Sequence, residues 1–144
     1  MTVTFFGHRV IPCDISERIR NTLVYLIEEK NAYNFYVGSN GEFDKTVCSI
    51  LKELKKTYPH IRYAVVLAYL PLLKKDKTIK YENTVVPEGI ERVPQKYAIC
   101  ARNKWMIEQA NTVITYVIDN TGGAAQFKAV AERKGKTIIN LAEF

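Results

Sequence analysis

Short apolar runs alternate with segments of helical periodicity along the chain, and this alternation restricts the fold more than any other feature. The apolar runs predict five strands, at Val3–Gly7, Asn34–Gly38, Ile61–Leu70, Thr112–Ile118 and Lys136–Leu141. Helical spacing predicts four helices between them, at about 16–30, about 44–57, Lys96–Ala110 and from Gly123 onward. Strands that alternate with helices indicate an α/β layer fold with a largely parallel sheet, covered by helices on both faces.

The length of 144 residues predicts a single domain that spans residues 1–144. One segment, at about 71–96, departs from the alternation because it carries several lysines and prolines and has no steady period. We expect it to be a long excursion over the top of the sheet, with a short strand near Thr84–Val86. Loops of this length in a compact domain are commonly functional or mobile.

The composition is that of a soluble globular protein, with 47% hydrophobic and 25% charged residues and a formal net charge of +6. The positive charge favours anionic partners. Cys13, Cys48 and Cys100 have no metal-ligand spacing, which predicts buried free thiols and no metal site. There is no signal-peptide pattern and no apolar run of about 20 residues, so we expect a cytoplasmic protein without a membrane partner.

Three polar stretches follow predicted strands, at the edge of the sheet where parallel α/β folds bind ligands. These are Gly7-His8-Arg9, the loop from Gly38 to Gly41, and Thr121-Gly122-Gly123. A glycine pair between a strand and a helix exposes backbone N–H groups at the helix N-terminus, where a phosphate is favoured. The alternative is a tight turn that needs glycine for its dihedral angles.

Charged residues near this edge suggest what the site binds. Arg9 is suited to contact a phosphate and His8 to donate a hydrogen bond, although both also fit a polar turn. Glu42 and Asp44 could hold ribose hydroxyls or act as acid or base, and Asp44 could instead cap a helix. Arg102 is predicted to face the same edge from the third helix.

The ordered set of stretches T-F-F-G-H-R, F-Y-V-G-S-N-G-E-F-D, R-N-K-W-M, G-G-A-A-Q and G-K-T-I-I-N-L covers nearly the whole chain. Together they resemble small YpsA-like proteins of the SLOG superfamily, named for the Smf/DprA and lonely-guy proteins. The resemblance implies a Rossmann-like three-layer sandwich whose five strands have the order 3-2-1-4-5. It also implies a nucleotide or nucleotide-derived ligand in the crevice between the first and fourth strands.

Enzymatic lonely-guy relatives cleave nucleoside monophosphates between base and ribose phosphate, with an R-K pair and a P-G-G-x-G-T-x-x-E loop. Arg102 matches the arginine of that pair, whereas Asn103 replaces the lysine. Gly122 and Gly123 match the glycine pair, but Ala125, Gln126 and Lys128 replace the next glycine, the threonine and the glutamate. Glycosidic cleavage uses a carboxylate to stabilise a cationic sugar, which lysine cannot do. The resemblance therefore favours a retained pocket without this reaction.

We accordingly predict a protein that senses or sequesters a nucleotide or an ADP-ribose-like molecule and needs no cofactor. The predicted ligand-binding residues are Gly7, His8, Arg9, Gly38, Ser39, Gly41, Asp44, Arg102, Thr121, Gly122 and Gly123. One alternative is a hydrolase of an N-glycosidic or phosphate bond, with Glu42 or Asp44 as the carboxylate. Another is a DNA-binding protein, although the scattered lysines lack the interleaved aromatic residues of a nucleic-acid groove. Relatives with this fold also suggest a homodimer.

Overall fold

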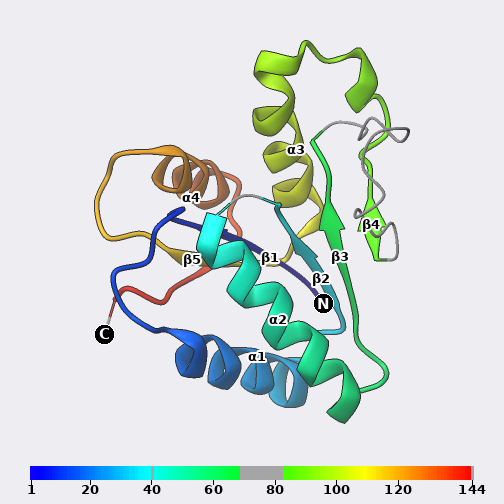
Figure 1. Ribbon diagram of the computed structural model, residues 1–144, viewed down its shortest axis with the longest axis vertical. Coiled ribbons are helices and arrows are strands. Elements are labelled where there is room, and N and C mark those ends of the chain that lie inside the picture. Colours follow the sequence, from blue (N-terminus) through cyan, green and yellow to red (C-terminus); the bar gives the residue numbers. More distant parts are fainter. Residues whose placement is uncertain (40, 69–82, 144) are drawn as a thin grey trace.

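The computed structural model describes residues 1–39, 41–68 and 83–143, in which helices and strands alternate (Figure 1). In chain order the elements are β1 (Thr2–Gly7), α1 (Ser16–Lys30), β2 (Asn34–Val37), α2 (Gly41–Thr57), β3 (Arg62–Val66), β4 (Thr84–Val85), the 3-10 helix η1 (Ile90–Arg92), α3 (Gln95–Gln109), β5 (Thr112–Tyr116), α4 (Gly123–Arg133) and β6 (Thr137–Asn140). The α/β class predicted from the alternation is confirmed.

The strands form one sheet of order β4-β3-β2-β1-β5-β6, in which every described pairing is parallel. The short strand expected near Thr84–Val86 is β4, and the prediction of a five-stranded sheet is one strand short because β4 joins that sheet beside β3. Backbone N–H groups of Val65 and Leu67 donate to the carbonyl oxygens of Asn83 and Val85, at 2.7 and 2.9 Å. The observed order therefore differs from 3-2-1-4-5 by this added strand.

The predicted excursion at 71–96 is partly regular where the structure describes it. Residues 83–94 contain β4 and η1, and α3 begins at Gln95. The part of the excursion from 71 to 82 lies outside the described residues. A strand of two residues is too short to produce a hydrophobic period, which explains why the sequence did not place it in the main sheet.

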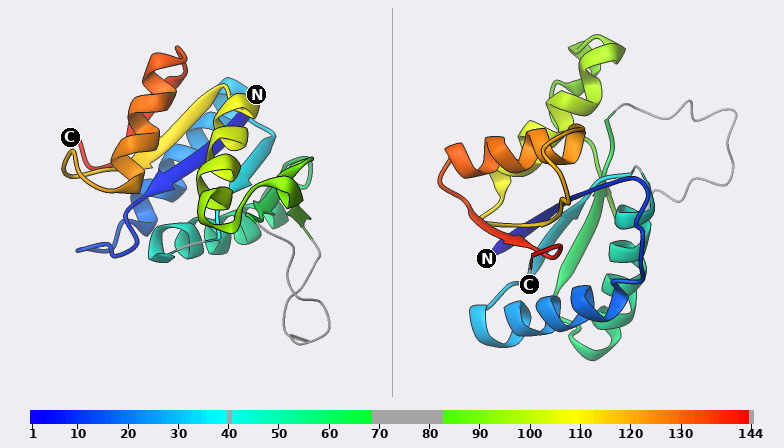
Figure 2. Two further views of the ribbon diagram at one scale, coloured as in Figure 1. Left: turned by 90° about the horizontal axis from the view of Figure 1, so that it is seen from above. Right: turned by 90° about the vertical axis from the view of Figure 1, so that its left-hand side faces the viewer.

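Helices cover both faces of the sheet, with α1 and α2 on one face and α3 and α4 on the other (Figure 2). The consecutive phenylalanines of β1 serve both layers, because neighbouring side chains of a strand point to opposite faces. Phe5 packs with α1 and α2 and stacks on Phe35, with ring centroids 6.4 Å apart. Phe6 packs with α3 and α4 and stacks on Phe127 at 5.7 Å. β1 is therefore the buried centre of the fold.

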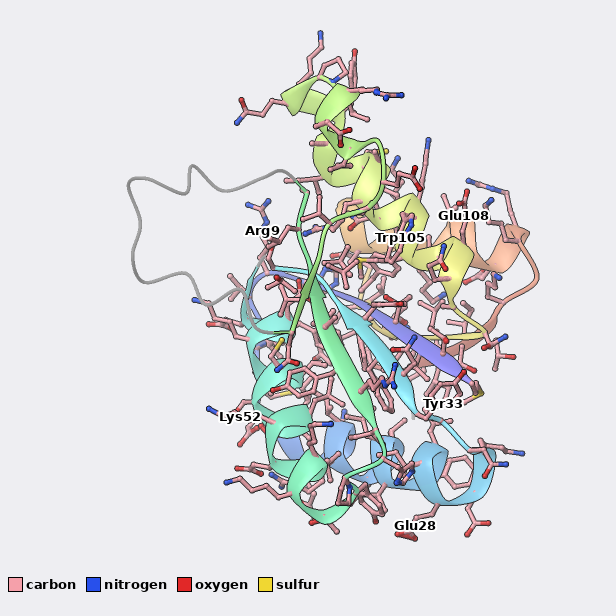
Figure 3. All side chains as sticks on the ribbon, turned by 90° about the vertical axis from the view of Figure 1, so that its right-hand side faces the viewer. Arg9, Glu28, Tyr33, Lys52, Trp105 and Glu108 are labelled. Carbon is pink, nitrogen blue, oxygen red and sulfur yellow. The ribbon has the colours of Figure 1, made fainter. Side chains whose placement is uncertain are left out.

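Charged side chains of α1 and α2, such as Glu28 and Lys52, point away from the sheet (Figure 3). Arg9 lies at the opposite end of the sheet from Glu28, at the edge where β1 ends. No helix within the described ranges is long and apolar enough to cross a membrane. All three cysteines are free thiols, but Cys13 is exposed and Cys48 and Cys100 are only half-buried, so the prediction of buried thiols is wrong.

Candidate functional site

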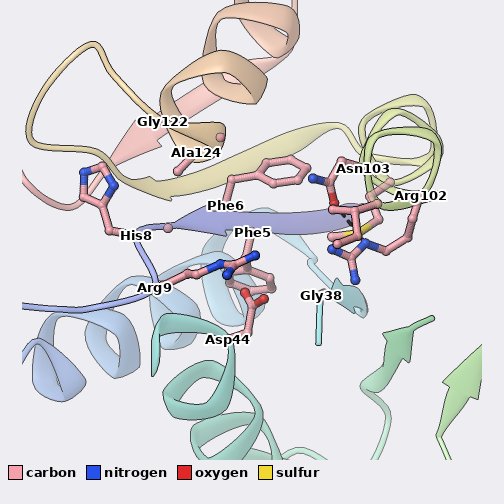
Figure 4. A pocket seen from close by; sticks show the side chains of 14 residues that line it. Phe5, Phe6, His8, Arg9, Gly38, Asp44, Arg102, Asn103, Gly122 and Ala124 are labelled. Atoms are coloured by element: carbon pink, nitrogen blue, oxygen red, sulfur yellow. Dashed lines mark hydrogen bonds between the residues drawn. The ribbon is translucent and has the colours of Figure 1, made fainter. Parts of the chain in front are cut away.

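A cavity of about 420 Å³ opens where β1 and β5 end, and we call it the β1–β5 pocket (Figure 4). Its lining includes the predicted site residues Gly7, His8, Arg9, Gly38, Asp44, Arg102, Gly122 and Gly123. The remaining lining residues are Phe5, Phe6, Ile99, Asn103, Met106 and Ala124. The predicted residues Ser39, Gly41, Thr121 and Glu42 are outside this lining.

The position of the pocket follows from the strand order. From β1 the chain builds β2 and β3 on one side, and it then returns through α3 to build β5 and β6 on the other side. The neighbouring strands β1 and β5 are therefore the point where the winding reverses, and loops diverge there to leave a crevice. The volume lies within the range of about 300–1,000 Å³ that is usual for small-molecule sites.

The N-terminus of α4 forms one wall of the pocket. Gly122 has a φ of +92°, a conformation that L side chains rarely adopt, and it turns the chain into the helix. A Cβ at Gly122 or Gly123 would meet no atom within 4 Å, so the backbone here faces open space. N–H groups in the first turn of a helix lack partners within the helix. This wall can therefore donate hydrogen bonds to an anion.

Thr121 supports this wall from outside the pocket. Its backbone N–H and its hydroxyl both donate to Asp119 Oδ1, at 3.0 and 2.8 Å. These hydrogen bonds to Thr121 lower the pKa of the Asp119 carboxyl, and the nearby His8 contributes in the same direction. Asp119 is therefore an anchor of the turn that leads into α4.

Arg9 lies opposite this wall, and the start of α2 fixes its backbone. The N–H of Glu42 donates to the carbonyl oxygen of Arg9 at 2.8 Å, and Glu42 Oε2 accepts from the N–H of Ile11 at 2.9 Å. A Cβ at Gly41 would lie 2.7 Å from Arg9 Cα. Gly41 and Glu42 therefore position the segment that carries Arg9 instead of lining the pocket themselves.

Arg102 reaches the pocket from α3 and is only 3% exposed. Its Nε donates to Asn103 Oδ1 at 2.9 Å, and its Nη1 donates to Ser39 Oγ at 3.1 Å and to the carbonyl oxygen of Val66 at 3.3 Å. A buried guanidinium requires such partners, because desolvation of an uncompensated charge is costly. Arg102 thus joins α3 to the ends of β2 and β3, and Ser39 belongs to this connection.

Gly38 lies close to both an acidic and a basic side chain at this side of the pocket. A Cβ at position 38 would lie 2.8 Å from Asp44 Oδ2 and 3.6 Å from the guanidinium carbon of Arg102. The absence of a side chain at Gly38 thus allows both groups to approach the backbone. Asp44 is the sole carboxylate among the lining residues within the part of the chain that the structure describes.

Gly7, the last residue of β1, allows α2 to approach the strand closely. A Cβ at this position would overlap the ring of Phe43, which belongs to the first turn of α2 and is fully buried. Only glycine permits this approach between strand and helix without movement of the ring. The contact brings the N-terminal turn of α2, and with it Asp44, to the edge of the pocket.

The sequence analysis missed the apolar part of the lining and Asn103 as a lining residue. Ile99, Asn103 and Met106 lie on α3 at the spacing of one helix face, the face that also carries Arg102. This spacing could have identified them once Arg102 was assigned to the site. The pocket position of Phe6 could not be predicted in this way, because an apolar residue in a strand is expected in the hydrophobic core.

The described residues contain no group of three or more His, Cys, Asp or Glu side chains that could hold a metal ion. The polar atoms that line the pocket instead favour an organic anion, because two arginines and a helix N-terminus face a single carboxylate. No protein-family model matches the chain, and no curated protein of significantly similar sequence was found. The resemblance to the SLOG superfamily therefore stays a prediction.

Proposed function

We propose that this protein binds a nucleotide or a nucleotide-derived molecule such as ADP-ribose in the β1–β5 pocket, in order to sense or sequester it. The observation that carries this proposal is the placement of Arg9 and the N-terminus of α4 on the lining of one cavity. A phosphate between them would accept backbone N–H bonds on one side and a guanidinium contact on the other. Asp44 would accept hydrogen bonds from ribose hydroxyls.

The apolar part of the lining supports a ligand that is more than a phosphate. Phe6 and Met106 are buried at the floor of the pocket, and Ile99 is 37% exposed at its rim. Such side chains favour a flat, weakly polar group such as a nucleobase. The pocket thus combines the two chemistries of a nucleotide.

Calorimetric titration with AMP, ADP, ATP, the guanine equivalents and ADP-ribose tests the proposal. Loss of one charge-assisted contact in Arg9→Ala should weaken binding about ten- to a hundredfold. Gly123→Val should weaken it further and leave the fold intact, because its side chain would enter open space on the pocket side. Arg133→Ala, an exposed position in the last turn of α4, controls for the change in net charge. Binding that neither Arg9→Ala nor Gly123→Val alters would place the ligand elsewhere.

A second candidate is hydrolysis of an N-glycosidic or phosphate bond, and the position of Asp44 favours it. Glu42 is engaged with the backbone of Ile11, whereas Asp44 lines the pocket. Lys128, which stands where enzymatic lonely-guy relatives have their glutamate, forms an ion pair with Glu132 at 2.7 Å. Chromatography of AMP and ADP-ribose after incubation distinguishes the candidates. Intact ligand supports binding alone, and release of free base or phosphate that Asp44→Asn abolishes would establish the hydrolase.

A further inference from the structure

The ring of His8 makes a contact that its predicted role as a donor to ligand does not include. His8 directly follows β1, and its Nε2 accepts a hydrogen bond from the backbone N–H of Ile118 at 3.0 Å. The backbone N–H of His8 donates to the carbonyl oxygen of Tyr116 at 3.3 Å. Because Nε2 is an acceptor here, it carries no proton, and the proton of the neutral ring is on Nδ1.

His8 and Asp119 together hold the loop between β5 and α4, which we call the 117–122 loop. His8 binds its beginning at Ile118, and Asp119 binds its end through the N–H and hydroxyl of Thr121. Thr121 directly precedes the glycine pair at the N-terminus of α4. Figure 4 shows the ring of His8 beside this loop, apart from the side chain of Arg9. Asn140 adds a third contact, because its Oδ1 accepts from the N–H of Val117 and its Nδ2 donates to the carbonyl oxygen of Val117, both at 3.0 Å. The backbone that would face a ligand phosphate is thus held at Val117, Ile118 and Thr121.

We propose that His8 is a positioning residue that holds the 117–122 loop in place only while its imidazole is neutral. Protonation of Nε2 would make it a donor that faces the N–H of Ile118, and this hydrogen bond would be lost. The imidazolium would also compete with Thr121 for the carboxylate of Asp119. Acidification that protonates the imidazole of His8 would therefore free the loop at Ile118.

Arg9, Tyr116 and Asp119 bear on the charge of the His8 ring. Arg9 is the next residue along the chain, and its side chain lies apart from the ring (Figure 4), whereas the carboxylate of Asp119 in the 117–122 loop favours the imidazolium. Tyr116 of β5 presents its ring at 88° to the imidazole, with centroids 6.3 Å apart. The carboxylate of Asp119 is therefore the group toward which a protonated His8 would turn.

The consequence for binding rests on the proposed function. If the glycine pair cradles a phosphate, release of the 117–122 loop disorders that cradle and affinity falls on acidification. An imidazolium that contacted the phosphate directly would have the opposite effect, because it would add a positive charge to the site. The direction of the pH dependence therefore separates a positioning role from a direct ligand contact.

Nuclear magnetic resonance of the 15N-labelled protein without ligand tests whether neutral His8 holds the 117–122 loop at Ile118. The amide resonance of Ile118 should titrate with the same midpoint as the His8 ring, and its protection from exchange should fall about tenfold from pH 8 to pH 5. His8→Gln retains an acceptor that does not titrate, so it should keep the protection at both pH values. The chain has one other histidine, His60, and His60→Gln should titrate as the wild type does. If the amide resonance of Ile118 does not change as the His8 ring is protonated, the proposal is overturned.

Titration with ADP-ribose at about pH 8 and pH 5 tests whether protonation of His8 weakens ligand binding. ADP-ribose is suitable because its pyrophosphate keeps the same charge over this range. The wild type should lose about tenfold in affinity at the lower pH, the equivalent of one hydrogen bond, and His8→Gln should not. Affinity that rises on acidification, or that falls equally in His8→Gln, would refute the positioning role. If ADP-ribose binds at neither pH, the proposed ligand is refuted, and the resonance of Ile118 alone decides the role of His8.

Discussion

Replacement of Gly41 by alanine should destabilise the protein more than any other glycine-to-alanine change at a positive φ. Gly41 begins α2 with a φ of +90°, which costs an L-residue about 1–2 kcal/mol. The new Cβ would also lie 2.7 Å from Arg9 Cα, a backbone atom that cannot rotate away. Such overpacking costs about 1–3 kcal/mol, so the free energy of unfolding should fall by about 2–5 kcal/mol in total.

Gly89→Ala is the matched control for this change. Gly89 has a similar φ of +83°, but a Cβ there would meet no atom within 4 Å. It should therefore show the backbone term alone, about 1–2 kcal/mol. The effect of alanine on the unfolded chain is shared by both variants and cancels in the comparison.

Urea unfolding at equilibrium measures both variants, with the slope checked to be unchanged so that midpoints report stability. The difference between the two variants isolates the contact between Gly41 and Arg9. If Gly41→Ala and Gly89→Ala unfold at the same urea concentration, the segment of Arg9 does not pack on the start of α2. The described support of Arg9 would then be refuted.

Two further predictions concern thiol chemistry and nucleic acid. Burial and the negative charge of Asp44 raise the pKa of Cys48 to about 11. At neutral pH iodoacetamide should therefore modify the exposed Cys13 well before Cys48, which peptide mass spectrometry would measure. Equal rates of modification would contradict the partial burial of Cys48. Fluorescence anisotropy should show that duplex DNA no longer binds at about 0.15 M salt, because scattered charges give only counterion-release affinity. Tight binding at that salt would support the DNA-binding alternative.

Much of the fold could be predicted because its signals are local. Unbroken apolar runs and helical spacing predicted β1, β2, β3, β5 and β6 and the four helices. The strand β4 is different, since two residues acquire their conformation from hydrogen bonds to β3 and not from any period of their own. Its place at the sheet edge is a tertiary property and was not visible in the sequence.

The candidate site was predictable to the extent that it depends on topology. Glycines that follow parallel strands meet at one edge, and this alone brought Gly7, Gly38 and Gly122 to the β1–β5 pocket. The direction of individual hydrogen bonds was not predictable. The acceptance of a hydrogen bond by His8 Nε2 from the N–H of Ile118, a residue 110 positions away, was not predicted, and the donation from His8 to a ligand stays a prediction. Such pairings depend on distances that only the folded chain sets.

The two arginines of the pocket illustrate why residue type alone does not assign a role. Arg102 is buried, and its Nε and Nη1 hydrogen bonds to Asn103, Ser39 and Val66 satisfy much of its guanidinium within the protein. Arg9 is exposed, and what the structure fixes is its backbone, through Gly41 and Glu42. In the proposed function a ligand would gain most from Arg9, because its side chain is exposed and lines the pocket. Arg102 instead contributes mainly by holding α3 against β2 and β3, which gives the pocket its shape before any ligand enters.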